Sequence, residues 1–232
     1  MGSWRAHGDS TWGLVTHLVE RRAGRDVLVE NADPEIQAPT GYSQWDLQQR
    51  MRLRLREGFV DVNVQHSTTT DVPRFDLYND RVGALPKWAE WCYGPQERTM
   101  LAVTHQKALS GGWVWTTLGS LQDVEESRIK RRFAQDLRVT QLEQVRVWGW
   151  TSVLRGRIRE WRLEGGLDGQ WNRVVSSAVG TDMLTGAQSM AQTRYADGGS
   201  SMNTWGGFAS AQRNVGSHEF RGGLRYSHAA VL

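Results

Sequence analysis

Arginine is the residue type whose spacing in this sequence most clearly points to a binding function. It occupies every second position in two segments, at Arg52, Arg54 and Arg56 and at Arg155, Arg157 and Arg159. If each segment is a β-strand, its guanidinium groups share one face and repeat every ~6.6 Å. A guanidinium group makes planar, two-point contacts with a phosphate or a carboxylate. The two arginine stripes therefore predict contact with nucleic acid or another polyanion.

The second stripe is the stronger candidate of the two. Asp61 and Glu57 partly neutralise the first stripe, whereas the second has no obvious acidic partner strand. In our interpretation a third basic group extends the same surface: Arg128, Lys130, Arg131 and Arg132. Solvated outer faces are the alternative explanation of all these charges. The net charge of +3 permits an acidic partner without requiring one.

Tryptophan is the second residue type that needs an explanation, because the chain of 232 residues contains 12. Two pairs have strand spacing, Trp113 with Trp115 and Trp148 with Trp150. Exposed aromatic pairs stack on bases or on sugar rings, but more often such residues fill a core or an interface. One core of this size rarely takes 12 tryptophans. We therefore expect several of them at a subunit interface or a ligand surface.

Residue patterns for catalysis and for metal binding are missing from the sequence. Cys92 is the single cysteine and stands in an aromatic setting, which predicts a buried thiol. No two histidines are four residues apart, and neither a nucleophile elbow nor a phosphate-binding glycine loop is present. We therefore predict no catalytic residue, no metal ligand and no cofactor. A dispersed Asp/Glu/His site, for example around the loop His66–Asp71, stays open as an alternative.

The clearest local signal is a β-hairpin over residues 50–66. Apolar and polar residues alternate on both sides of Glu57-Gly58, which we take as the turn. This register places Leu55 opposite Val60 and Leu53 opposite Val62. It also places Arg54 opposite Asp61 and Arg52 opposite Asn63. Apolar residues then pair with apolar residues, and arginine pairs with an acid or an amide.

Further strands follow from the same alternation. A second hairpin is predicted from Trp12–Glu20 and Arg25–Asn31, with Ala23-Gly24 as its turn. A third joins Thr99–His105 to Trp113–Leu118 through Ser110-Gly111-Gly112. Single strands are predicted over 144–151, 153–163 and 170–175. Glycine-containing breaks divide the C-terminal region into short strands, at 197–199, 214–216 and 222–223.

One segment, residues 120–138, predicts a helix. Ser120 is a candidate N-cap with Asp123 three residues later. A mostly apolar stripe with helical spacing follows, formed by Leu121, Val124, Arg128, Ile129, Phe133 and Leu137. The fold class predicted from all these elements is β-rich α+β. Antiparallel hairpins would form a sandwich or a partly open barrel, with this helix packed against it.

The organisation of the chain favours one domain. We expect a single β-rich domain over residues 1–232, with a change near residue 165 to a region rich in Gly, Ser and Ala. The longest apolar runs have four residues, such as Met100–Val103, which is too short for a transmembrane helix. The first residues contain no apolar segment typical of a signal peptide. We therefore expect a cytoplasmic or particle-associated location rather than secretion.

These observations favour a non-enzymatic assembly protein. The first hypothesis is a self-associating subunit, as in a virus-like particle, that contacts nucleic acid or another polyanion through its arginine-lined strand faces. The second is a carbohydrate-binding module that uses the tryptophan pairs as a platform. The third is a hydrolase with a dispersed Asp/Glu/His site. The first hypothesis predicts a homo-oligomer, and the second predicts a monomer with exposed tryptophan.

Overall fold

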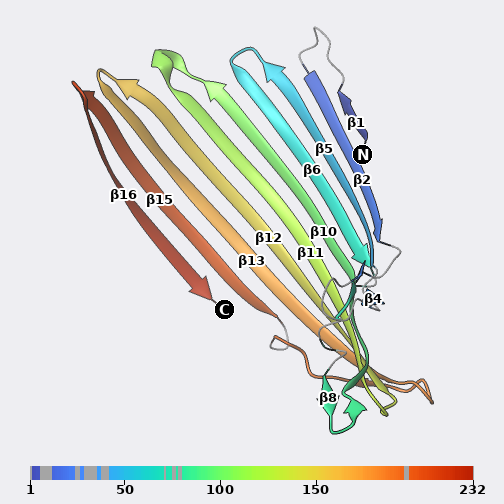
Figure 1. Ribbon diagram of the computed structural model, residues 1–232. Coiled ribbons are helices and arrows are strands. Elements are labelled where there is room, and N and C mark those ends of the chain that lie inside the picture. The colour runs from blue at the N-terminus through green and yellow to red at the C-terminus, as the bar shows by residue number, and fades with distance from the viewer. Residues whose placement is uncertain are drawn as a thin grey trace.

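The fold is an antiparallel β-sheet in a single layer (Figure 1). The computed structural model describes residues 2–5, 12–23, 27–28, 36–37, 42–70, 72–74, 77, 80–195 and 199–231, with side chains from Tyr42 onward. Ten strands form the main path of the sheet: β1 (Gly2–Arg5), β2 (Trp12–Ala23), β5 (Tyr42–Leu55), β6 (Gly58–Thr70), β10 (Trp88–Ala108), β11 (Val114–Arg132), β12 (Leu137–Ile158), β13 (Trp161–Asp182), β15 (Ser200–Val215) and β16 (His218–Val231).

The strands follow one another in the sheet in the order in which they occur in the chain. Each strand of the main path pairs antiparallel with the next, so the sheet is a simple meander. Shorter strands lie beside this path or apart from it: β3 (Val27–Leu28), β4 (Ile36–Gln37), β7 (Val72–Pro73), β8 (Arg81–Val82), β9 (Leu85–Pro86) and β14 (Gln188–Met190). Of these, β7 pairs with β10 and β14 pairs with β13.

One end of the sheet is closed by tight turns, which lie at the top of Figure 1. Two residues join β5 to β6, two join β12 to β13, and two join β15 to β16. The 3₁₀ turn Ser110–Gly112 lies between β10 and β11. Glycine is required at Gly216, where φ is 61°, and at Gly111, where φ is 72°. We call this end the tight-turn end of the sheet.

The described side chains, from Tyr42 onward, form no apolar core. Trp91 and Ala178 are the buried hydrophobic residues among the described side chains, and each keeps 9% of its surface. The accessible surface is 16370 Å², whereas a compact monomer of 26.3 kDa exposes about 10,600 Å². The excess means that the apolar side chains of this sheet are not covered by a second layer of the described chain. Something outside these residues must cover them if they are to leave water.

The predicted helix over residues 120–138 is wrong, and with it the predicted α+β class. Ser120 and Asp123 lie in β11, and Leu137 opens β12. The spacing of three or four residues that suggested a helical stripe places Leu121 and Val124 on opposite faces of β11. Among the described residues, helical conformation is limited to Leu77 and to the 3₁₀ turn Ser110–Gly112. The predicted sandwich is also wrong, because the long strands form one sheet.

The predicted hairpin over residues 50–66 is confirmed, but its register differs by two residues. The turn is Arg56-Glu57, so that Leu53 lies opposite Val60 and Arg52 opposite Asp61. Gly58 opens β6 instead of forming the turn. A Cβ atom on Gly58 would lie 1.8 Å from the carbonyl oxygen of Gln106, so the close approach of β10 requires glycine there.

The other predicted strands have mixed outcomes. The pair Thr99–His105 and Trp113–Leu118 is confirmed within β10 and β11, although β11 begins at Val114. The predicted strand 153–163 is wrong, because β12 ends at Ile158 and β13 begins at Trp161. The predicted break at 222–223 is wrong because it lies within β16, whereas the break at 214–216 coincides with the turn before β16.

The predicted partner of Trp12–Glu20 is also wrong. This segment belongs to β2, which pairs with β1 and β5, whereas Val27–Leu28 pairs with Ile36–Gln37. Residues 24–26, 29–31 and 196–198, which complete this predicted hairpin and the predicted break at 197–199, lie outside the described residues.

None of the described helical segments is long and apolar enough to cross a membrane.

Candidate functional site

The two faces of the sheet differ in chemistry, and β13 shows the difference most clearly. On one side it carries Trp161, Leu163, Gly165, Leu167, Gly169 and Trp171. On the other side it carries Arg162, Glu164, Gly166, Asp168, Gln170 and Asn172. Successive side chains of a strand point to opposite faces, so this alternation separates apolar from polar residues over the whole segment. We call these sides the apolar face and the polar face.

The apolar face continues across neighbouring strands because directly paired residues share a face. One cross-strand row of this face contains Leu101, Leu121, Trp148 and Trp171. A parallel row contains Val62, Val103, Gly119, Trp150, Gly169 and Trp205. Trp148 and Trp205 each expose 53% of their surface. Large aromatic and aliphatic side chains therefore form a continuous exposed band.

The four tryptophans singled out in the sequence all lie on this band. Trp115 is paired with Leu154, and its indole N–H donates to the Ser152 hydroxyl at 2.8 Å. Trp113 precedes β11 and lies over Gly156, where an added Cβ would come within 2.2 Å of the indole ring. Trp148 and Trp150 lie on the same face of β12. These residues are thus neither core nor a compact ring platform, but parts of an extended apolar surface.

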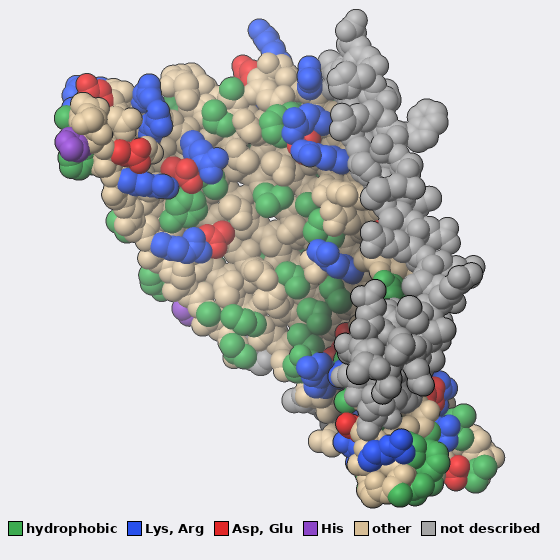
Figure 2. Space-filling view, viewed as in Figure 1, with side chains coloured by type: hydrophobic (Ala, Val, Ile, Leu, Met, Phe, Trp, Pro, Cys, Tyr) green, Lys and Arg blue, Asp and Glu red, His purple; other side chains and the backbone are tan. Residues whose placement is uncertain are grey.

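The polar face is seen in Figure 2, where acidic and basic side chains lie next to each other near the tight-turn end. The first arginine stripe lies on this face. Arg52 Nε donates to Asp61 at 2.6 Å, and Arg50 binds the same carboxylate at 2.9 Å. Asp61 keeps 8% of its surface and is among the most buried residues described. Arg54 shares the face, whereas Arg56 lies in the turn.

The second stripe is divided by a turn. Arg155 and Arg157 lie on the polar face of β12, whereas Arg159 adopts a φ of 55° in the turn before β13. Arg155 donates to Glu164 at 2.8 Å, so the expectation that this stripe lacks an acidic partner strand is wrong for that residue. Arg157 instead lies directly opposite Arg162. A run of three arginines on one strand face does not exist here.

The third basic group lies far from the other two, at the opposite end of β11. Arg128 forms an ion pair with the buried Glu143, which also binds Arg194 at 3.2 Å. Arg131 and Arg132 belong to the same strand, and Arg132 lies 5.8 Å from the Trp88 ring. Burial lowers the pKa of the Lys130 ammonium, with a further lowering from the charges of Arg128 and Arg132. These groups do not extend the arginine stripes into one basic surface.

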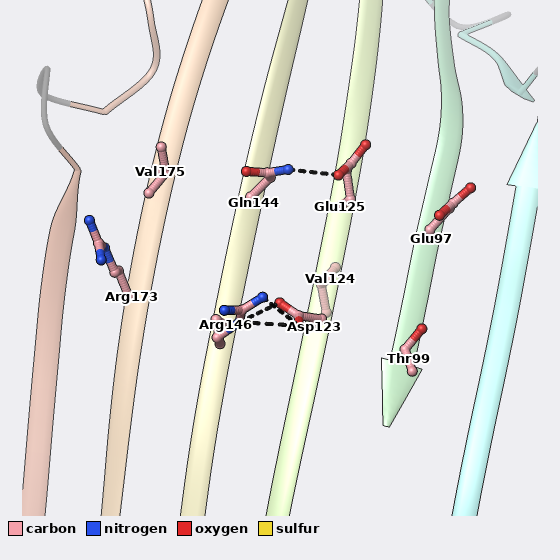
Figure 3. Close-up of a pocket in the computed structure, with 9 residues that line it drawn as sticks. All are labelled: Glu97, Thr99, Asp123, Val124, Glu125, Gln144, Arg146, Arg173 and Val175. Carbon is pink, nitrogen blue, oxygen red and sulfur yellow. Dashed lines mark hydrogen bonds and ion pairs between the residues drawn. The ribbon is translucent and has the colours of Figure 1, made fainter. Parts of the chain in front are cut away.

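A cluster of charged residues borders the apolar band at the end away from the tight turns (Figure 3). Arg146 binds Asp123 through two nitrogens, with Nη2 at 2.9 Å, and Gln144 donates to Glu125 at 2.8 Å. Arg173 lies directly opposite Arg146. Together with Glu97 these side chains line a hollow of about 400 Å³. On the same face, the Arg146–Arg173 pair beside this hollow lies two residues along the strands from the Trp148–Trp171 pair.

The described residues contain no group of three His, Cys, Asp or Glu side chains that could hold a metal ion. The charged clusters form ion pairs with one another. What the arrangement provides is a wall with one apolar and one polar side.

This wall resembles solved structures of transport proteins. The copper transporter OprC superposes with a TM-score of 0.69 at 11% identity over 95% of this chain and 33% of its own. The ferric citrate transporter FecA in its unliganded form gives 0.66 at 11% identity over 97% and 33%. The ferric yersiniabactin uptake receptor FyuA from Yersinia pestis gives 0.61 at 13% identity over 94% and 34%.

The likeness is one of fold. The chain resembles part of a TonB-dependent receptor β-barrel and spans about one third of the length of these structures. No family model and no curated protein matches the sequence.

The comparisons overturn three expectations from the sequence. The self-associating, virus-like assembly protein that contacts nucleic acid is contradicted, because the shared fold is that of transporter barrels. The alternatives of a carbohydrate-binding module and a hydrolase have no support in this fold either. The cytoplasmic or particle-associated location is contradicted, because the similar structures are bacterial outer-membrane receptors.

Proposed function

We propose that this chain forms part of the wall of an outer-membrane β-barrel that carries a solute across the membrane. The apolar face contacts lipid and the polar face lines the lumen. The observation that carries the proposal is the band of exposed Trp and Leu side chains on one side of a sheet whose described side chains form no apolar core. A soluble protein does not tolerate a contiguous apolar surface of this extent, whereas a barrel in lipid requires one.

The size of the band supports this assignment. From Trp161 to Trp171 the apolar face of β13 extends about 33 Å along the strand. With the ~40° tilt of strands in membrane barrels, this length spans about 25 Å along the membrane normal, which is the height of the apolar band in such barrels. Aromatic residues mark both limits of the band on this strand. The charged cluster of Asp123, Arg146 and Arg173 then lies at the level of the lipid headgroups.

The arrangement of polar groups supports the same orientation. Asp61 and Glu143 are more buried than any leucine described, which is the reverse of the pattern in a soluble protein. Both carboxylates bind arginine on the polar face. A water-filled or protein-filled lumen accommodates such pairs, whereas lipid does not.

Further strands are needed to complete the barrel. Among the described strands none pairs with the outer edge of β16, and lipid provides no partner for the backbone groups of that edge. The similar structures are about three times as long as the chain. Those structures are of a copper transporter, a ferric citrate transporter and a ferric yersiniabactin uptake receptor, and solute transport is the function that we carry over to this chain.

Two arginine substitutions on β13 test the orientation of the sheet. Leu167 lies near the middle of the apolar band, and Gln170 is the matched control on the polar face of the same strand. In phospholipid vesicles, Leu167→Arg is expected to lower the free energy of unfolding by about 2–4 kcal/mol, while Gln170→Arg changes it by less than about 1 kcal/mol. Urea titrations followed by tryptophan fluorescence measure both values. Equal effects of the two substitutions would contradict the proposal.

A further inference from the structure

A row of arginines crosses the polar face next to the tight-turn end. Arg157 on β12 lies directly opposite Arg162 on β13, which lies opposite Gln212 on β15. Gln212 in turn lies opposite Arg221 on β16. Neighbouring strands are about 4.8 Å apart, so the row measures about 14 Å from end to end. Three guanidinium groups and one amide therefore point from the same face along one line.

Two acids lie beside this row, Glu160 and Glu164, but each forms its ion pair with an arginine outside the row. Among the described residues, Arg157, Arg162 and Arg221 take part in no ion pair and no side-chain hydrogen bond. Glu164 is bound by Arg155, and Glu160 in the turn pairs with Arg213. Like charges placed directly opposite each other on neighbouring strands destabilise a sheet. The Arg157–Arg162 pair is therefore unfavourable unless an anion lies between the two side chains.

Other arginines of the polar face show that this imbalance is local. Arg52 binds Asp61, and Arg225 binds Asp168 at 2.8 Å. Arg128 binds Glu143. Each of these arginines has its carboxylate on a neighbouring strand or one strand further away. These three arginines are thus neutralised by a carboxylate, whereas the arginines of the row are not.

The surface around the row is hollowed on both sides of Arg162. One hollow of about 230 Å³ is lined by Arg157, Arg159, Arg162 and Gln212, together with Glu160 and Asn214. A second of about 230 Å³ is lined by Arg155, Arg162, Arg221 and Gln212, together with Glu164 and Ser210. Each hollow offers three guanidinium groups and one carboxylate, and that carboxylate is already paired with an arginine. A volume of this size holds several water molecules or one small oxyanion.

We propose that this row binds a small multivalent oxyanion, a solute that carries phosphate or clustered carboxylate groups. Arg157 and Arg162 would each make two-point contacts with one anionic group, and Arg221 would bind a second group across Gln212. The row is too short to follow an extended polyanion, since its charges span about 14 Å. The inference rests on the proposed function for its place in the lumen, and it extends that function by naming the class of solute.

The test uses inorganic pyrophosphate as the probe and the full chain folded in detergent micelles. Isothermal titration is expected to show binding to the unchanged protein that weakens with added sodium chloride. Arg157→Gln with Arg162→Gln should weaken this binding roughly tenfold or more, because two charge-assisted contacts are lost. The same double variant should melt at a higher temperature without pyrophosphate, since the like-charge pair is removed.

The chain offers a matched control. Arg146 and Arg173 form the same kind of directly opposed pair between the same two strands, but on the apolar face. Arg146→Gln with Arg173→Gln should leave pyrophosphate affinity unchanged. Replacement of Arg157 and Arg162 by lysine keeps the charge but loses the planar guanidinium group. The affinity of this variant for pyrophosphate should lie between that of the unchanged protein and that of the Arg157→Gln, Arg162→Gln variant. Absence of pyrophosphate binding, or equal binding by the double glutamine variant, would overturn the inference.

Failure of this inference can be distinguished from failure of the proposed function. Pyrophosphate binding is measured in micelles and needs no bilayer, whereas contact of the apolar face with lipid is measured in vesicles. Pyrophosphate binding without lipid contact would support the anion site and contradict the membrane assignment. Lipid contact without pyrophosphate binding would support the membrane assignment and contradict the anion site.

Discussion

Trp148 on β12 lies directly opposite Trp171 on β13, and both side chains are about half exposed, at 53% and 48%. Two large aromatic residues that face each other across strands without cover lose most of the benefit of their apolar surface in water. The same pair is favourable at the edge of a lipid bilayer, where aromatic rings are enriched. This pair of residues therefore distinguishes a membrane wall from a soluble sheet.

Quenching of tryptophan fluorescence by brominated phospholipids measures this contact. In vesicles that contain brominated acyl chains, the protein is expected to be strongly quenched. Trp148→Phe should reduce the quenched fraction, because one lipid-facing fluorophore is lost. Trp91→Phe is the control, since Trp91 is buried and lies beyond the charged cluster at the rim of the band. A similar reduction in both variants would argue against lipid contact of the apolar face.

Removal of one carboxylate from the polar face should destabilise the sheet. Asp61→Asn keeps the shape of the side chain but leaves Arg50 and Arg52 without their shared partner. We expect a loss of about 1–3 kcal/mol in the free energy of unfolding, because a nearly buried charged group loses its bonds. Urea unfolding in micelles measures the change. Arg54→Gln on the same strand face should have almost no effect, since Arg54 forms no ion pair in the described part of the chain.

From the sequence alone, the face of the sheet on which a side chain lies was predicted better than the residue paired with it on the next strand. Over residues 50–66 the alternation assigned each side chain to its correct face although the register was shifted by two residues. A shift of two preserves the face, whereas a shift of one would have exchanged both faces. The turn at Arg56-Glu57 could not be distinguished from one at Glu57-Gly58, because Gly58 is required by the approach of Gln106 from a distant strand.

The longest pattern in the chain was missed for a physical reason. On β13 the apolar face includes Gly165 and Gly169, which interrupt the count of apolar residues in the sequence. Glycine fits at Gly169 because the ring of Trp171 occupies the space where a side chain would lie. The helix over 120–138 was predicted because no core enforces strict alternation at that end of β11. The Arg157–Arg162 pair could not be predicted without the turn at Arg159-Glu160.

The turn after β13 should depend on pH. The backbone N–H groups of Thr185 and Leu184 donate to Asp182 and lower the pKa of its carboxyl group. A depressed pKa means that the charged form stabilises the turn at pH values above the ordinary aspartate value of about 3.9. This contribution is lost as the pH falls through the lower value of the folded state. Amide hydrogen exchange measures this loss. The protection factors of the Leu184 and Thr185 amides, which correct for the intrinsic effect of pH on exchange, should be lower at pH 2–3 than at neutral pH.

A variant separates this effect from general acid unfolding. Asp182→Ala should remove the protection of both amides at neutral pH and abolish its pH dependence, while amides of the central strands stay protected. A pH dependence that persists in Asp182→Ala would assign the effect to another group.

Gly156 should not tolerate a larger residue, because Trp113 covers it on the apolar face. A Cβ atom at this position would lie 2.2 Å from the indole ring, so Gly156→Ala must displace Trp113. We expect a loss of about 1–3 kcal/mol in the free energy of unfolding, typical of overpacking. Gly119→Ala is the matched control on the same face, since no atom lies within 4 Å of its added Cβ. That substitution should be neutral or slightly stabilising, because glycine weakens a strand interior. Urea titrations in micelles compare the two variants, and equal stabilities would show that Trp113 does not hold this position.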